Sequence, residues 1–208
     1  MSYVPAVVLL MIIYMTSLVG FTTAHQQAWY LYYTPYFILL NAVLLLLYQK
    51  EWSKSTLYFG ASALFLGFAV EIIAVQTASL YGSYSFGETL GFKALGVPLV
   101  LPIYWLVNAL STACLVHKLP LKNPWILSAL GAFLMVLLTG IIHQLAPRLD
   151  FWSISSPNGL LRLSLVWFLF GFALQYLFIR LKVAAKNPMA IYVYGGLLIF
   201  FLGVFNFL

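Results

Sequence analysis

One acidic residue lies inside a long apolar run of this chain and is the strongest candidate for chemistry. Glu71 falls within Leu57–Leu80, a stretch long enough to cross a membrane as one helix and without any other charged residue. A carboxylate at the centre of a bilayer costs roughly 2.5–3.5 kcal/mol on insertion scales, so such groups normally face a bundle interior and a partner. We therefore expect Glu71 to be functional.

Further polar residues are predicted on the same side of the membrane as the end of this segment. Glu88 and Asp150 lie in two connectors on that side. Glu71 precedes the end of its segment by about nine residues, or roughly 13 Å at 1.5 Å per residue. We expect a polar pocket with Glu71 at its floor. The other polar residues of this half are His25, Gln26, Gln27, Gln76, His143, Gln144, Arg148 and Arg162.

Each of these residues also has a simpler interpretation. Glu88 and Asp150 would then be solvated or paired loop charges, and His143 would be an interfacial histidine. Arg162, just inside the sixth segment, would extend its charge to the interface. Asn108, midway along the fourth segment, would make an ordinary interhelical hydrogen bond. Glu71 is the residue for which a purely structural role is least expected, because of its cost in an apolar helix.

The sequence gives little support for a metal or another cofactor. His25, His143 and Glu71 would form a His-His-carboxylate set, but they come from three segments without a local spacing such as HExxH. The sequence also contains no Gly-rich phosphate loop, serine elbow or CxxC motif. We expect neither a metal nor a cofactor.

The composition is that of an integral membrane protein. Of 208 residues, 64% are hydrophobic and 7% charged, and the mean hydropathy is +1.02. At about 20 apolar residues per span, we expect an all-α bundle of about seven transmembrane helices, forming one domain over residues 1–208. The expected spans are Pro5–Ala24, Trp29–Tyr48, Leu57–Leu80, Leu95–Val116, Pro124–Leu145, Leu160–Leu181 and Met189–Leu208.

The basic residues predict the orientation of these spans. Seven of the ten Lys and Arg residues lie in or beside the second, fourth and sixth connectors. Cytoplasmic loops carry an excess of Lys and Arg, so we place the N-terminus in the cytoplasm. Separately, we expect the chain in the cytoplasmic (inner) membrane of a prokaryote. The net charge of +6 is then a topology signal, and no nucleic acid partner is expected.

The third connector, Tyr81–Lys93, is rich in glycine and aromatic residues and too apolar for an ordinary solvated loop. Irregular backbone at membrane depth is tolerated only where protein or a wet cavity covers it. We therefore expect this connector to fold back against the helix ends.

The stretch from Glu71 to Trp105 resembles the carotenoid biosynthesis membrane-protein family, which includes carotenoid 1,2-hydratases. The shared pattern is an intramembrane Glu, a Gly-Xaa-Tyr-Xaa-Xaa-Gly turn, and a Pro and a Trp that open the next helix. These positions are Glu71, Gly82, Tyr84, Gly87, Pro98 and Trp105. Asp150-Phe151-Trp152 also looks like the family, whereas its Asn-Tyr-Xaa-Xaa-Trp element has no clean counterpart around Asn158 and Trp167.

The resemblance implies hydration of the terminal double bond of an acyclic carotenoid end group to a tertiary alcohol. Glu71 would be the general acid, because an apolar bundle disfavours the charged form of a carboxyl group. Asp150 or Glu88 would be the base for water attack. Aromatic faces would stabilise the carbocation. The expected substrate contacts are Tyr81, Tyr84, Phe86, Trp105, Asn108, His143, Trp152 and Arg162.

Three other functions are compatible with the residues. A solute or proton carrier would use Glu71 and His143 as a relay, although the sequence shows no internal repeat of the kind transporters carry. A non-catalytic membrane subunit would scaffold other carotenoid-pathway enzymes. An end-group cyclase would form the same cation and capture it with a neighbouring double bond. For the carotenoid-modifying enzyme, the expected partners are a carotenoid substrate, membrane lipid and other carotenoid-pathway enzymes.

Overall fold

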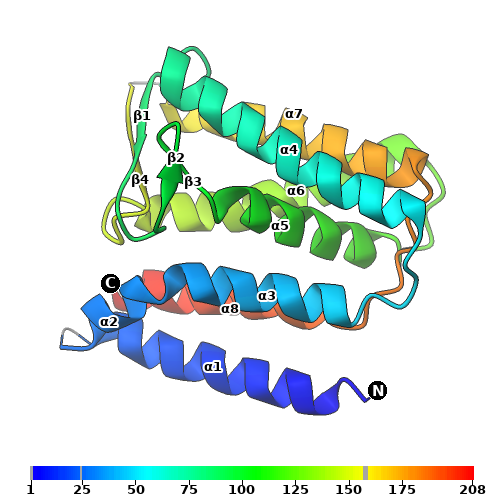
Figure 1. Ribbon diagram of the computed structural model, residues 1–208, viewed down its shortest axis with the longest axis horizontal. Coiled ribbons are helices and arrows are strands. Elements are labelled where there is room, and N and C mark those ends of the chain that lie inside the picture. The colour runs from blue at the N-terminus through cyan, green and yellow to red at the C-terminus, as the bar shows by residue number, and fades with distance from the viewer. Residues whose placement is uncertain (1, 24, 157–158) are drawn as a thin grey trace.

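The apolar segments of the sequence fold as helices, because a helix bonds its own backbone groups where water is absent. The computed structural model describes residues 2–23, 25–156 and 159–208, in which eight helices form the predicted all-α bundle (Figure 1). The helices are α1 (Val4–Thr22), α2 (Gln27–Tyr32), α3 (Thr34–Leu47), α4 (Lys54–Thr77), α5 (Leu101–Val116), α6 (Pro124–Leu145), α7 (Gly159–Arg180) and α8 (Ala190–Phe207).

Five of these helices, α1, α4, α6, α7 and α8, are long and apolar enough to cross a membrane. The apolar helices α3 and α5 are shorter, with 14 and 16 residues. Seven spans and a cytoplasmic N-terminus therefore stay predictions. The predicted end of the first span, Ala24, lies outside the described residues.

Two predicted helices differ from the observed ones. The segment Trp29–Tyr48 is divided at Tyr33 into α2 and α3, with Pro35 in the first turn of α3. Proline lacks a backbone N–H and is tolerated at a helix start rather than in its interior. The segment Leu95–Val116 becomes helical only at Leu101.

A short hairpin replaces the missing start of that helix. Strands β2 (Lys93–Ala94) and β3 (Val97–Pro98) pair antiparallel. Leu95 and Gly96, which connect them, have φ values of 54° and 82°. Two successive residues with positive φ make the tight turn that suits the twist of a hairpin. The hairpin is held to α4 by Gln76, whose Nε2 donates to the backbone oxygen of Leu95 at 2.8 Å.

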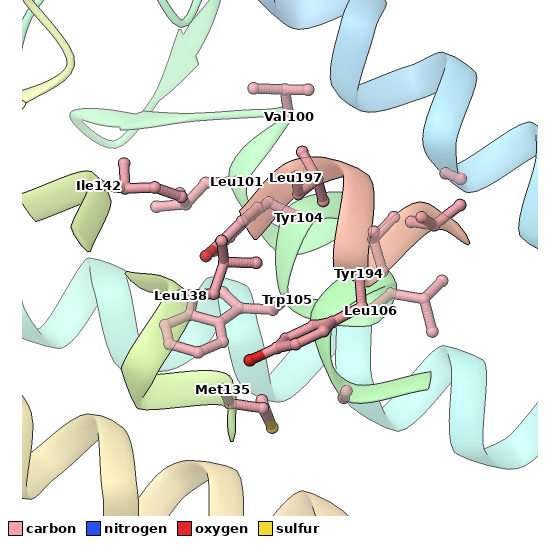
Figure 2. Close-up of a cluster of buried hydrophobic side chains, with 14 of the residues drawn as sticks. Val100, Leu101, Tyr104, Trp105, Leu106, Met135, Leu138, Ile142, Tyr194 and Leu197 are labelled. Atoms are coloured by element: carbon pink, nitrogen blue, oxygen red, sulfur yellow. The ribbon is translucent and has the colours of Figure 1, made fainter. Parts of the chain in front are cut away.

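Helix α5 is the centre of the bundle. It contacts α3, α4, α6, α7 and α8, and fourteen of its sixteen residues are buried, Cys114 among them. Figure 1 shows α4 and α7 on one side of α5 and α6, and α3 and α8 on the other, with α1 beyond them. Figure 2 shows side chains of α5 meeting those of α6 and α8 in one buried apolar cluster.

The third connector folds back over one end of the bundle, as predicted. Its strand β1 (Ser83–Phe86) pairs antiparallel with β4 (Trp152–Ser155), which precedes α7. Tyr81, Tyr84 and Phe86 are buried in the core. The ribbon of β1 and β4 therefore joins the connectors before α5 and α7 into one cover over the helix ends (Figure 1).

We predict that Gly87→Ala destabilises this cover by about 1–3 kcal/mol, because an added side chain must displace well-packed neighbours. A Cβ atom at Gly87 would overlap the backbone and side chain of Asp150. Gly60→Ala in α4 is the matched control, since a Cβ atom there meets nothing within 4 Å. Thermal unfolding in detergent, followed by circular dichroism, measures both. Equal stability of the two variants would contradict the prediction.

Candidate functional site

Glu71 lies on the buried stripe of α4, where the sequence places mostly small residues. The stripe runs Ala63, Gly67, Glu71 and Ala74, at the three- and four-residue spacing of one helix face. A Cβ atom at Gly67 would lie 3.1 Å from Cβ and Cδ1 of Trp105. The glycine therefore lets the indole of α5 lie directly against α4, beside the carboxyl group.

The Glu71 carboxyl group is bonded at one oxygen and free at the other. Its side chain is enclosed, with 1% of the residue exposed. Nε1 of Trp105 donates to Oε1 at 3.1 Å. Within the described residues, Oε2 has no hydrogen-bond partner. One oxygen is thus fixed in place, and the other can carry or give up a proton.

Aromatic side chains surround this carboxyl group. We define the Glu71 cluster as Glu71, Tyr81, Tyr84, Trp105 and Trp167. The ring of Tyr81 lies 5.1 Å from that of Tyr84 and 6.3 Å from that of Trp167, and Trp167 lies 6.1 Å from Trp105. In the part of the chain that the structure describes, the Tyr81 hydroxyl and Trp167 Nε1 are also buried without partners. The cluster combines electron-rich ring faces with unbonded polar atoms.

The two tyrosines of the cluster stay neutral. Burial raises the pKa of both Tyr81 and Tyr84, and the nearby Glu71 carboxylate raises each pKa further. A phenol whose ionised form is so disfavoured keeps its proton. Neither tyrosine can therefore serve as the base of a reaction at neutral pH.

A second aromatic layer connects the cluster to the ribbon. Trp152 in β4 lies 6.1 Å from Trp167 and 6.5 Å from Phe86. Its Nε1 donates to Nδ1 of His143 at 3.0 Å, with the two rings nearly parallel. Because Nδ1 accepts this bond, a neutral His143 carries its proton on Nε2. The predicted residues Phe86, His143 and Trp152 are thus brought together next to the cluster.

Glu88 and Asp150 lie outside the Glu71 cluster. Asp150 Oδ2 accepts the backbone N–H of Glu88 at 2.7 Å, and Glu88 forms an ion pair with Lys93 at 2.7 Å. Asp150 therefore fixes the turn after β1. The Glu88 side chain is largely exposed.

These charged residues line a cavity of about 990 Å³ between α2, α3 and the start of α5. Its lining is otherwise mostly apolar and includes Leu31, Pro35, Leu39, Leu90, Val100 and Ile103. Glu71 does not line it. Ile103 and Trp105 are two positions apart, or roughly 200° around the helix. The cavity and the Glu71 cluster accordingly lie on nearly opposite faces of α5.

Three further predicted residues are separate from the cluster. His25 lies exposed before α2, and Arg162 is exposed on α7. Asn108 is buried on α5 and bonds α6 through the backbone oxygen of Met135 at 3.2 Å. Among the described residues, no three His, Cys, Asp or Glu side chains group as metal ligands would. The structure does not bring His25, His143 and Glu71 together.

Trp167 was not among the residues predicted to line the site. Its ring lies against those of Tyr81, Trp105, His143 and Trp152, so it joins the Glu71 cluster to the second aromatic layer. The sequence carries a weak signal for it. Trp167 follows Leu163 by four residues and precedes Gly171 by four, on the buried face of α7. Asn158, near which the family's Asn-Tyr-Xaa-Xaa-Trp element has no clean counterpart, lies outside the described residues.

A family model described as carotenoid biosynthesis protein matches residues 33–160, which is more than half of the chain. The matched range includes Glu71, Tyr81, Tyr84 and Trp105 of the Glu71 cluster, whereas Trp167 lies beyond its end. No curated protein matches the chain, and no solved structure does.

We predict that the Trp105–Glu71 hydrogen bond couples α4 to α5. Trp105→Phe should cost about 1–3 kcal/mol of stability, because it leaves a buried oxygen unbonded. The same change should cost less in a Glu71→Leu background, with a coupling energy of about 0.5–3 kcal/mol. Thermal unfolding of the four proteins in detergent measures this cycle. Equal costs in both backgrounds would show that the bond contributes nothing.

Proposed function

Since the chain belongs to the carotenoid biosynthesis protein family, we propose that it adds water to the terminal carbon–carbon double bond of an acyclic carotenoid end group. The observation that carries this proposal is the buried Glu71 carboxyl group, bonded at Oε1 and unbonded at Oε2 within the described residues, among aromatic rings. An isolated alkene is a very weak base, and its protonation requires an acid kept neutral until it reacts. An apolar enclosure favours the neutral carboxyl form.

In the first step, Glu71 gives its proton to the less substituted carbon of the double bond. The π electrons form the new C–H bond, and the positive charge falls on the more substituted, tertiary carbon. The carboxylate that remains keeps its hydrogen bond from Trp105. A charge-assisted hydrogen bond is stronger than a neutral one, so this bond stabilises the charged state formed with the cation.

The aromatic rings of the cluster stabilise the cation. A positive charge within about 6 Å of an aromatic face gains roughly 0.5–2 kcal/mol, and more when it is desolvated. Tyr81, Tyr84, Trp105 and Trp167 enclose the region beside Glu71. The rings themselves offer no strong nucleophile, and the one carboxylate beside the cation is engaged by the hydrogen bond from Trp105.

In the second step, water adds its oxygen to the tertiary carbon, and the protonated alcohol returns a proton to a base. The Glu71 carboxylate would be this base, since Glu88 and Asp150 line the cavity on the other face of α5. Glu71 would then act as acid and base in turn. The sum is one alkene and one water converted to one tertiary alcohol.

We predict that Glu71→Gln lowers formation of the hydrated carotenoid by at least about 10²-fold, because the change keeps the shape and removes the acid. The measurement is the pigment profile, by chromatography and mass, of a lycopene-producing host expressing each protein. Glu51→Gln is the matched control, since Glu51 is a half-exposed residue paired with Lys186.

Four outcomes separate the candidate functions. A product heavier by one water, lost in a well-folded Glu71→Gln protein, supports the hydratase. An isomer of unchanged mass whose end group is a ring would identify an end-group cyclase acting through the same cation. Normal hydration by Glu71→Gln would exclude Glu71 as the acid, and an unchanged profile with the unmodified chain would favour a non-catalytic or carrier role.

We predict that Trp167→Leu lowers hydration about tenfold, the rate equivalent of 1.4 kcal/mol of lost cation stabilisation. Trp167→Phe, which keeps an aromatic face, should lose less. The control is Trp125→Leu, since Trp125 is more than half exposed and stacks on Phe172 and Tyr176, away from Glu71. A comparable loss in the control would mean that Trp167 acts through stability alone.

A further inference from the structure

A line of polar side chains runs through the apolar core between α5, α6 and α7. We define the α5–α7 polar cluster as Tyr104, Asn108 and Thr112 on one face of α5, Thr139 on α6 and Gln175 on α7. The α5 residues follow at a spacing of four. The Tyr104 and Thr139 hydroxyls lie 2.8 Å apart, and Gln175 Nε2 donates to Thr112 Oγ1 at 2.8 Å. All five side chains are buried.

The amide donors of this cluster are used, whereas in the described part of the chain its two amide oxygens are not. Asn108 Nδ2 donates to the Met135 backbone oxygen at 3.2 Å and to Thr139 at 3.3 Å. Over the residues described, Oδ1 of Asn108 and Oε1 of Gln175 are buried without a hydrogen-bond partner, and so are the hydroxyls of Ser111 and Ser128. Each such group costs about 1–3 kcal/mol if it stays unbonded. A ligand that donates hydrogen bonds to these oxygens would therefore bind favourably here.

The chemistry of the acceptors identifies the class of ligand. Amide and hydroxyl oxygens attract hydrogen-bond donors, and the cluster contains no cationic side chain that would hold an anion. It also contains no carboxylate to balance a cation. A small neutral donor that bonds several oxygens at once is water, and buried waters typically make about three hydrogen bonds to such groups.

The backbone of α6 is shaped around this cluster. Gly131 faces Gln175, and a Cβ atom there would lie 2.5 Å from both Cδ and Oε1 of the glutamine. A side chain at this position would displace the unbonded amide oxygen. The absence of a side chain therefore leaves Gln175 room between α6 and α5.

The cluster reaches the level of the Glu71 cluster along α5. Tyr104 directly precedes Trp105, their rings are 5.9 Å apart, and Trp105 bonds Glu71. In the other direction it extends toward Ser128, near the start of α6 and at the end of the bundle away from the strands (Figure 1). In Figure 2, Tyr104 and Trp105 lie side by side on α5, above Met135.

We propose that the α5–α7 polar cluster binds water inside the bundle and supplies it to the cation formed beside Glu71. The supply role rests on the proposed function, because it concerns the capture step of hydration. A cation that meets water gives the alcohol. A cation that does not loses a proton and returns an alkene of unchanged mass, so the water supply sets the ratio of the two products.

The test compares Asn108→Leu and Gln175→Leu with a matched control, Asn41→Leu. Asn41 is equally buried but bonds Tyr14 and the backbone of α3, away from the cluster. In the lycopene-producing host, both cluster variants should lower the ratio of hydrated to isomerised product about tenfold, the equivalent of one lost hydrogen bond of 1.4 kcal/mol. The control should leave the ratio of hydrated to isomerised product unchanged, even where it lowers the total amount of product. An unchanged ratio in the cluster variants overturns the supply role.

Infrared spectroscopy of the purified proteins tests water binding independently of catalysis. Internal water gives O–H stretching bands that shift on exchange into H₂¹⁸O. These bands should be present in the unmodified protein and in Asn41→Leu, and weaker in Asn108→Leu and Gln175→Leu. Unchanged bands in the cluster variants would overturn the water site. If the bands weaken in the cluster variants but the unmodified protein hydrates no carotenoid, the water site is supported and the proposed function is rejected.

Discussion

An apolar bundle offers a polar side chain no water to bond, so each such group needs a partner on another helix. Helix α5 supplies most of these partners. Its Trp105 bonds Glu71 of α4, its Asn108 bonds α6, and its Thr112 accepts from Gln175 of α7. Three bonds to three different helices fix the level and rotation of α5. Apolar packing alone would leave both less well determined, because many apolar arrangements have similar energy.

The same constraint separates two regions that the sequence could not separate. Glu71, Glu88 and Asp150 were expected in one pocket, because all three lie in one half of the molecule. Helix α5 divides them, with Trp105 and Glu71 on one face and Ile103 and the charged cavity on the other. Position along the membrane normal can be read from segment lengths, whereas rotation about a helix axis depends on which neighbours pack against each face.

Several features were readable from the sequence for a physical reason. Apolar runs locate the helices because burial and backbone bonding both favour them, and the Glu71, Tyr84 and Trp105 grouping followed from a family-like motif. The pairing of β1 with β4 was not readable, because it depends on how two distant connectors meet. Nor was the hairpin turn, since leucine seldom adopts the positive φ that Leu95 has. Pro35 indicated the division at Tyr33, but the apolar residues on both sides of it favoured one continuous helix.

The ribbon of β1 and β4 has a consequence for how this protein matures. Its two strands are separated in the chain by α5 and α6, so the cover over Glu71 forms only after both helices are synthesised and the fifth connector has emerged. Until then Tyr81 and Tyr84 cannot meet Trp167, and a chain with only its first four helices in place holds Glu71 without Trp105 and Trp167. The enclosure of Glu71 therefore requires a segment that is synthesised late, because Trp167 lies on α7.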